Sequence, residues 1–214
     1  MNKVTYLAKA FVFVARKHIT GLDVEPTPHF EPEGLAFFNS IIQDTRIYLE
    51  YGSGGSTVQA AKHVKTLVSV ESDPVFMQAV ERKIAKESKA EIHLLNPHIG
   101  MTAHWGTPVF SRATPSRIQR WKRYPQAPWQ VLNEVPDTIL VDGRMRVACA
   151  LESLLHVTRD TRMIVDDYVG REYEVIEDFA DLVATHGIMA EFRKKDFDPA
   201  LCRERLQRYY AVLR

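Results

Sequence analysis

Cysteine is scarce in this chain of 214 residues. Cys149 and Cys202 are its two cysteines, which is too few for a disulfide framework. Neither lies at the spacing of a metal site. The sequence therefore predicts two packed thiols in a reducing compartment, and we expect a cytoplasmic protein.

A long apolar run is also missing, so the sequence predicts no membrane span. The charges nearly balance, with 28 Lys and Arg against 27 Asp and Glu and a formal net charge of +1. The whole-chain balance argues neither for nor against a nucleic-acid partner, and we do not expect one. Hydrophobic residues make up 45% of the chain, which is typical of a globular protein.

The N-terminal segment lacks the cleavage site of a signal peptide, and basic residues interrupt its apolar core. Its apolar residues instead recur at helical spacing on one face: Val4, Leu7, Ala8, Phe11, Ala15 and Ile19. We expect an amphipathic helix that packs on the domain or on a partner chain, which would form a homo-oligomer. Attachment to a membrane surface is the alternative.

Short apolar strands alternate with helices over the rest of the chain. Strands are expected at 47–51, 66–70, 91–95, 138–141, 162–165, 188–192 and 209–213. Helices are expected at 33–42, 56–64, 74–87, 146–156 and 172–185. This alternation predicts an α/β fold whose parallel sheet is covered on both faces. The last two strands lack a good helix between them, so a reversed strand is expected and the sheet should be mixed.

The pattern also suggests how the chain is divided. Residues 1–32 are expected to form the N-terminal helix and a proline-rich connector, and residues 33–214 the main domain. The alternation lapses at about 97–136, which is too long for a plain connection, so we expect an inserted lid or substrate wall there. Its aromatic and cationic residues could bind an acidic sugar, a phosphate-bearing group or a nucleic acid. A solvated helix with packed tryptophans is the alternative.

A glycine-rich loop follows the first expected strand, in the stretch IYLEYGSGGST at 47–57. Its glycines would let a ligand lie against bare backbone amides. The second expected strand ends at an acid, Glu71, roughly 20 residues past the loop, where nucleoside-binding folds hold a ribose hydroxyl. The loop and the acid together predict a nucleoside cofactor. A dinucleotide fingerprint would need glycine at position 57, where this chain has Thr57.

The pattern acid–x–Gly–x–Gly–Gly, followed by VSVESD, resembles the first two motifs of class I S-adenosylmethionine-dependent methyltransferases. The resemblance implies a Rossmann-like methyltransferase fold, with a seven-stranded mixed sheet, helices on both faces and an antiparallel last strand. It implies S-adenosylmethionine as the cofactor, with contacts from Glu50, Gly52, Ser53, Gly54, Glu71, Ser72 and Asn96. Glu50 would meet the methionine amino group and Glu71 the ribose. Asn96 stands where the family often has an acid for the adenine amine.

Acids end the fourth and fifth expected strands: Asp142, Asp166 and Asp167. Three carboxylates at one rim repel one another unless a cation or proton is shared, and oxygen ligands suit Mg²⁺. The layout resembles the metal-dependent catechol-type O-methyltransferases, which implies a Mg or Mn site, although Met145 replaces the lysine base of that subfamily. The alternative is neutralisation without a metal by nearby arginines: Arg144, Arg146 and Arg171.

These features predict methyl transfer from S-adenosylmethionine, with oxygen as the expected acceptor atom. The candidate catalytic residue is Asp142. A small-molecule or sugar-type substrate is expected. Two alternatives stay open: a non-catalytic module that binds S-adenosylmethionine, and a nicotinamide-dependent oxidoreductase, which Thr57 disfavours.

Overall fold

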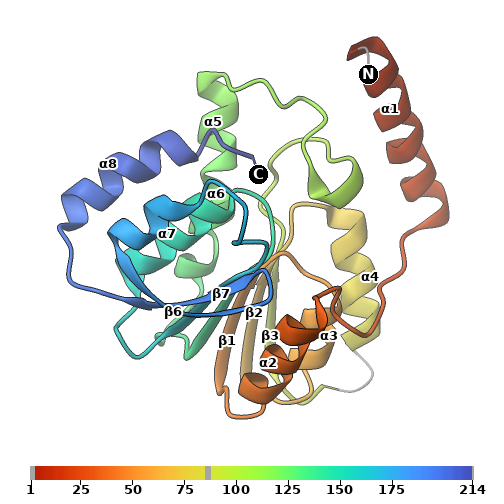
Figure 1. The fold of residues 1–214 in the computed structure, drawn as a ribbon. Helices are drawn as coiled ribbons and strands as arrows, with labels where there is room; N and C mark the ends of the chain where they lie inside the picture. The colour runs from red at the N-terminus through yellow and green to blue at the C-terminus, as the bar shows by residue number, and fades with distance from the viewer. Residues whose placement is uncertain (1–2, 85–87, 214) are drawn as a thin grey trace.

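The computed structural model describes residues 3–84 and 88–213, which form a seven-stranded sheet (Figure 1). The strands are β1 (Ile47–Tyr51), β2 (Thr66–Val70), β3 (Glu91–Leu95), β4 (Thr138–Val141), β5 (Arg162–Val165), β6 (Ala180–His186) and β7 (Met189–Lys194). Their order across the sheet is β3-β2-β1-β4-β5-β7-β6. Strands β1 to β5 are parallel, and β7 runs antiparallel to β5 and β6. The predicted mixed sheet with an antiparallel last strand is confirmed.

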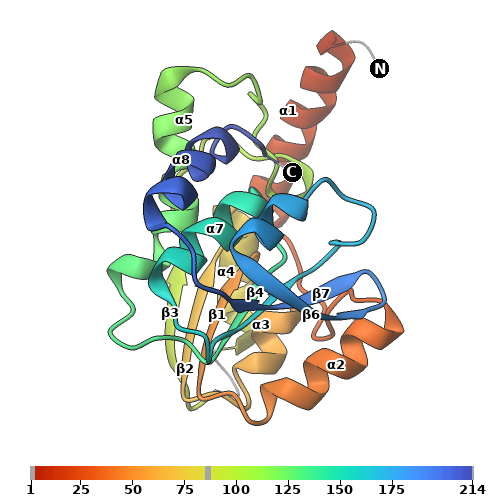
Figure 2. The same cartoon turned by 60° about the vertical axis from the view of Figure 1, so that its left-hand side comes forward.

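Helices cover both faces of the sheet (Figures 1 and 2). One face carries α2 (Pro32–Ile42), α3 (Gly55–Ala60) and α4 (Pro74–Ile84). The other carries α5 (Pro115–Trp121), α6 (Arg123–Gln126), α7 (Arg146–His156) and α8 (Pro199–Tyr209). Short 3-10 turns are η1 (His104–Gly106), η2 (Pro128–Gln130) and η3 (Glu174–Asp178), and α1 (Lys3–Thr20) stands at one edge of the molecule.

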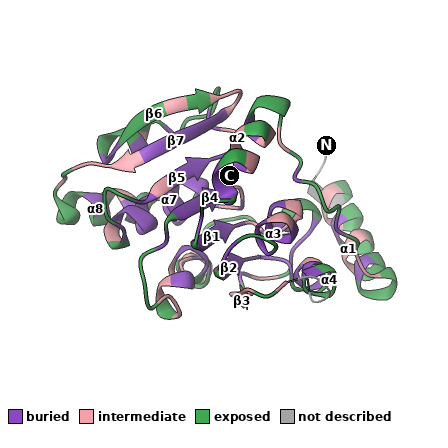
Figure 3. Cartoon of the chain, turned by 90° about the horizontal axis from the view of Figure 1, so that it is seen from below, coloured by how far each residue is buried: buried purple, intermediate pink, exposed green. Residues whose placement is uncertain are grey.

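The central strands are apolar on both sides because both sides are covered. In β1, Leu49 and Tyr51 pack in the core that contains α7, whereas Tyr48 packs in the core that contains α2 and α3. Figure 3 shows these strands buried, while β6 and the outer side of α1 are exposed. Parallel strands end at the same edge, so the loops after β1, β2, β4 and β5 share one rim.

The second half of the insertion is packed as part of the core. Trp121 and Tyr124 are buried against the sheet. The Trp121 indole donates to the Ile99 carbonyl at 3.1 Å, and the Tyr51 hydroxyl donates to the Pro125 carbonyl at 2.8 Å. This half therefore covers the sheet. Trp121 packs underneath, as the alternative interpretation expected, whereas Trp105 in the first half is 82% exposed.

The helix expected at 172–185 is wrong. The segment forms η3 and then β6, an edge strand that pairs with β7. His186 pairs with Met189, which leaves a two-residue turn, and Gly187 has a φ of +65° at its first position. The ladder with β7 outweighs the local helical spacing, because strand formation depends on cross-strand partners. The expected strand at 188–192 is β7.

The strand expected at 209–213 is also wrong, because this part of the chain follows directly on α8. Asp198 caps that helix by accepting from the Ala200 amide at 2.8 Å, and Pro199 fits its first turn. Every fourth residue is buried in the core beside α7: Cys202, Leu206 and Tyr210. The seventh strand is instead β6, which comes from the segment expected to be helical.

The remaining elements lie where the sequence predicts them. Helix α3 ends at Ala60 instead of at 64, and the expected last turn of α4, at 85–87, lies outside the described residues. Among the helices of the described ranges, none is long and apolar enough to cross a membrane.

Leu206→Ala should destabilise the protein by about 2–5 kcal/mol, because it opens a cavity between α8 and the core. Leu206 is 2% exposed, whereas Leu201 on the same helix is 44% exposed. The matched control Leu201→Ala should therefore cost less than about 1 kcal/mol. Urea unfolding of the two variants measures the difference. Equal losses would contradict the packing of α8.

Candidate functional site

A cavity of about 730 Å³ opens where β1, β2, β4 and β5 end. This volume suits a small molecule or a cofactor. The loops after these strands form one wall, and the connector after α1 forms the other, together with residues 103–106 of the insertion. Eight of the predicted site residues line the cavity: Gly52, Ser53, Gly54, Glu71, Ser72, Asp142, Asp166 and Asp167. Glu50 and Asn96 lie outside the lining.

The three glycines of the loop have different surroundings. Gly52 has a φ of +96°, and a Cβ there would lie 2.7 Å from the Gly143 backbone. A Cβ on Gly55 would lie 2.3 Å from the carbonyl oxygen of Thr27 in the connector. A Cβ on Gly54 would meet nothing within 4 Å. Gly52 and Gly55 therefore allow close backbone contacts, whereas Gly54 borders open space in the cavity.

The backbone amides of residues 52, 53 and 54 already have acceptors inside the protein. In that order, the acceptors are the Val70 carbonyl (2.8 Å), Glu71 Oε2 (3.2 Å) and Thr57 Oγ1 (2.8 Å). A pyrophosphate at such a loop would need free amides that point at it. The geometry therefore disfavours a dinucleotide here and suits a ligand without phosphate.

Glu50 lies behind the loop, fully buried. Four hydroxyl groups donate to its carboxylate: those of Tyr48, Ser56, Thr57 and Ser69. Burial raises the pKa of Glu50, and the hydroxyl hydrogen bonds oppose that rise. In this geometry Glu50 connects α3 to β1 and β2 from behind the cavity lining.

Glu71 presents its carboxylate to the cavity with acceptor positions to spare. Oε1 accepts from the Asp73 amide at 2.7 Å, and Oε2 accepts from the Ser53 amide at 3.2 Å. The Ser72 hydroxyl has one hydrogen and two acceptors at 3.0 Å, Glu71 Oε1 and the Gly106 carbonyl. Each carboxylate oxygen therefore has one fixed backbone donor and room for another. Burial raises the pKa of Glu71 from 4.5 to about 7.

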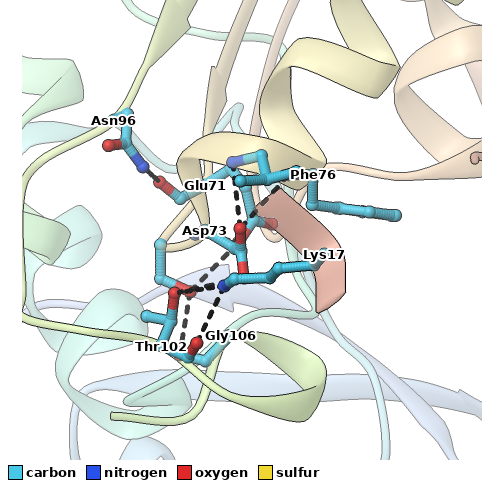
Figure 4. Close-up of polar contacts among 9 residues, drawn as sticks. Lys17, Glu71, Asp73, Phe76, Asn96, Thr102 and Gly106 are labelled. Carbon is cyan, nitrogen blue, oxygen red and sulfur yellow. Dashed lines mark hydrogen bonds and ion pairs between the residues drawn. The ribbon is translucent and has the colours of Figure 1, made fainter. Parts of the chain in front are cut away.

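Asn96 positions the end of β2 from behind. Its side-chain amide donates to the Glu71 carbonyl oxygen at 2.6 Å (Figure 4). This contact directs the amide toward the backbone and away from the cavity. In this geometry Asn96 supports Glu71 from outside the cavity lining.

A buried ion pair joins α1 to the cavity wall (Figure 4). The Lys17 ammonium pairs with the Asp73 carboxylate and donates to the Thr102 carbonyl at 2.8 Å. Both charged side chains are at most 4% exposed. Asp73 also accepts from the amides of Val75 and Phe76, which caps α4. One carboxylate therefore connects α1, α4 and the insertion.

A buried arginine neutralises the acids at the other side of the cavity. The Arg146 guanidinium donates to Asp142 Oδ1 at 2.8 Å and lies 3.0 Å from Asp167 Oδ2. It also donates to the Asp166 backbone carbonyl at 2.6 Å. Arg171 lies 3.1 Å from Asp167 Oδ2. The sequence analysis left neutralisation by nearby arginines open as the alternative to a metal. The short distances from Arg146 and Arg171 to these carboxylates favour that alternative.

The Mg or Mn site predicted at Asp142, Asp166 and Asp167 is not supported. Over residues 3–84 and 88–213, no three Asp, Glu, His or Cys side chains are grouped to hold a metal ion. The Arg146 guanidinium lies within 4.0 Å of an oxygen of each of the three carboxylates. It supplies the positive charge that the prediction assigned to a metal.

Two carboxyl groups of this cluster, those of Asp142 and Asp166, hold protons more tightly than free carboxyls. Burial raises the pKa of Asp142 well above its usual range, the nearby Asp166 adds to the rise, and Arg146 opposes it. Burial also raises the pKa of Asp166, and Arg146 opposes that rise too. Such a carboxylate is a stronger proton acceptor than a solvated one.

Backbone strain gathers around the same cavity. In the part of the chain that the structure describes, three non-glycine residues have a left-handed backbone: Trp105, Met145 and Asp167. Trp105 and Asp167 line the cavity, and Met145 follows Arg144, which also lines it. Such conformations cost about 1–3 kcal/mol each and cluster at functional sites.

Sequence reasoning missed several residues of this site. It treated the connector as a link, although residues 22–25 and 28–30 line the cavity. Gly55 was part of the quoted motif, but its contact with Thr27 could not be foreseen. Nothing in the sequence indicates that Lys17 is buried in an ion pair, because a lysine at the edge of an amphipathic helix is ordinarily solvated.

Gly52→Ala should lower stability by at least about 2 kcal/mol, because alanine combines a left-handed backbone with a clash against the Gly143 backbone. Gly54→Ala should change stability by less than about 0.5 kcal/mol, because its Cβ would face open space and its φ of 173° is extended. Denaturant unfolding compares the two. A destabilised Gly54 variant would show that the loop is packed differently.

Known proteins of similar structure include methyltransferases. No family model and no curated protein matches the chain. Among solved structures, it is similar to a methyltransferase-like protein from Silicibacter pomeroyi DSS-3, with 29% identity, a TM-score of 0.77, and coverage of 89% of this chain and 98% of that one. It also shares the fold of the N-methyltransferase NodS from Bradyrhizobium japonicum WM9, solved with S-adenosyl-L-homocysteine, at 12% identity, a TM-score of 0.50, and coverage of 87% and 99%. The chain is thus similar to a methyltransferase-like protein, and its sheet order and overall structure are those of the class I S-adenosylmethionine-dependent methyltransferase fold.

Proposed function

We propose that this protein binds S-adenosylmethionine in the cavity and transfers its methyl group to a hydroxyl oxygen of a small-molecule acceptor, with sugar-type compounds included. The proposal rests mainly on the position of Glu71. This buried carboxylate at the end of β2 has one acceptor position open on each oxygen. The cofactor supplies an electrophilic methyl group. The residues of the chain bind it, orient the acceptor and accept a proton.

The two open positions on Glu71 suit a vicinal diol. A ribose offers two adjacent hydroxyls, and a carboxylate can accept one on each oxygen. Ser72 can turn its single hydrogen toward the Gly106 carbonyl at 3.0 Å and leave Glu71 Oε1 to a ligand. Gly54 adds open space, and Ser53 adds a polar group beside it.

The occupied loop amides favour S-adenosylmethionine over a nicotinamide dinucleotide. Because residues 52–54 donate inside the protein, the loop has little left for a pyrophosphate. S-adenosylmethionine carries no phosphate. Its carboxylate suits Arg144, a partly buried cation on the cavity wall without an acidic partner within the described residues.

Asp142 is the proposed base. Arg146 holds Asp142 Oδ1, and the side chain remains partly exposed toward the cavity. Its raised pKa matches a group that takes a proton from an acceptor hydroxyl. Arg146 compensates the carboxylates, so this proposal assigns no role to a metal. A non-catalytic module that binds the cofactor is the remaining alternative, and it would lack proton transfer at Asp142.

Binding of S-adenosylhomocysteine should weaken as the pH falls below about 7, because protonation of Glu71 removes an acceptor for the ribose. The dissociation constant should rise by at most about tenfold per pH unit. In Glu71→Gln it should be raised by about ten- to a hundredfold at neutral pH and should not vary with pH. Calorimetric titration measures both, with Glu91→Gln as a surface control and NAD as a second ligand. A wild-type affinity that does not depend on pH, or tight NAD binding, would contradict the assignment.

A rise in pH should strengthen ligand binding but should lower the folding stability of the protein without ligand. Glu71 has a higher pKa in the folded than in the unfolded protein, so folded protein without ligand binds more protons between pH 4.5 and about 7. Its stability should fall across that window as the pH rises, by up to about 3 kcal/mol. Glu71→Gln should remove this fall, and thermal melts across the window check it.

Asp142→Asn should lower methyl transfer by at least about a hundredfold, because the base is lost, and should leave S-adenosylhomocysteine affinity unchanged. Asp167→Asn is the matched control at the same rim. The assay follows labelled S-adenosylmethionine incubated with a small-molecule fraction of cell extract. EDTA followed by Mg²⁺ or Mn²⁺ should leave the rate unchanged. Equal effects of both variants would remove Asp142 as the base, and bound cofactor without any transfer would favour the non-catalytic module.

A further inference from the structure

Helix α1 has a second apolar face that is largely exposed in the part of the chain that the structure describes. Ala8, Phe11, Val12, Ala15 and Ile19 recur at intervals of three and four residues, so they form one stripe. Phe11, Val12 and Ile19 are 45%, 68% and 84% exposed. The sequence analysis predicted Ala8, Phe11, Ala15 and Ile19, with Val4 and Leu7 but without Val12, as the packing face. In the structure these four residues are exposed, on the outer side of α1 (Figure 3).

The opposite face of α1 makes the contacts with the domain. Ala10 is buried against Ala103 and Val109, and Phe13 packs on His104 with ring centroids 3.7 Å apart and the rings tilted by 30°. The Lys17 ammonium fixes the same face through Asp73 and Thr102. Burial of the inner face leaves the outer stripe free along most of the helix.

The apolar stripe continues onto the insertion. Phe11 meets Phe110 with ring centroids 6.4 Å apart, and Phe110 is 46% exposed. On the same segment, Trp105 is 82% exposed and also lines the cavity. Figures 1 and 2 show α1 and α5 rising from the same end of the molecule. We call these exposed groups, with the outer stripe of α1, the docking surface.

Basic and acidic residues are unevenly distributed along the sequence. Residues 1–22 and 96–133 contain nine of the 28 Lys and Arg residues and none of the 27 Asp and Glu residues. The remaining residues therefore have a net charge of −8, although the whole chain has +1. Exposed basic side chains on these two segments are Lys9, Arg16, Arg112, Arg120 and Arg123. The Arg117 guanidinium lies over the Phe110 ring, 5.5 Å from its centroid.

We propose that the docking surface binds the face of an anionic lipid bilayer, with α1 lying in the interface. A basic amphipathic helix with exposed large apolar side chains is the usual device for this binding. Anionic headgroups would attract the arginines and lysines, and the acyl boundary would accept Phe11, Val12 and Ile19. The whole-chain charge concealed this polarity, because the acids elsewhere offset it.

Other occupants fit the surface less well. A second copy joined through α1 would bring two acid-free basic helices together, and like charges repel. Nucleic acid would match the charge but leave the apolar stripe uncovered. The bilayer satisfies both properties at once. Because Trp105 belongs to both the docking surface and the cavity wall, docking would bring the cavity close to the membrane.

Flotation with lipid vesicles tests this inference without any methyl-transfer assay. The full-length protein should float with vesicles of phosphatidylglycerol and phosphatidylcholine, should not float with phosphatidylcholine alone, and should be released by high salt. The variant Phe11→Ser/Val12→Ser/Ile19→Ser should reduce partitioning by at least about tenfold. Lys9→Gln/Arg16→Gln should reduce it as well.

A matched control changes exposed apolar residues elsewhere: Val169→Ser/Val183→Ser/Leu201→Ser, at 50%, 54% and 44% exposure. It should float like the wild type, and all variants should keep the wild-type melting temperature. Failure of the wild type to float, or an equal loss in the control, overturns the proposal. So does a dimer by light scattering that the stripe variant splits without vesicle binding, which would assign α1 to a second copy. Tight binding of an RNA oligonucleotide in place of vesicles would overturn it in favour of nucleic acid.

Discussion

The ion pair between Lys17 and Asp73 holds together the parts of the chain that enclose the cavity. Lys17 comes from α1, Asp73 follows β2, and both contact Thr102 of the insertion. The two charges are buried, so each depends on the other, because an unpaired buried ion costs several kcal/mol. The pair anchors α1 and thereby the connector, which crosses the cavity and touches the backbone at Gly55. The cavity wall, the cap of α4 and the orientation of α1 all depend on this contact.

Close backbone contacts organise the opposite wall. Gly52 lies against Gly143, so the loop after β1 touches the loop after β4. This contact brings Glu71, which accepts from the first loop, and Asp142, which begins the second, into one cavity. The two carboxylates suit different roles in the proposed function. Glu71 has open acceptor positions for a diol, whereas Asp142 is held by Arg146 and has a raised pKa, which favours proton uptake.

The sequence predicted the features that repeat locally and missed those that depend on distant partners. The five parallel strands are apolar runs between clear helices, so their ends, and the place of Glu71, could be predicted. Strand β6 forms because β7 pairs with it, and α8 packs as a helix on α7, which local periodicity did not reveal. The same limit applies to the acids. Nothing in a spacing pattern shows that Glu50 faces four hydroxyls or that Arg146 sits among three carboxylates.

A crystal structure of the protein with S-adenosylhomocysteine tests the central claim most directly. The account predicts the ribose diol on the two oxygens of Glu71, with the amide donors of Asp73 and Ser53 retained, and the ligand beside Gly54. The Lys17–Asp73 pair should remain in place as the wall of the filled cavity. A ligand bound outside this cavity, or a ribose that leaves Glu71 without a contact, would contradict the account.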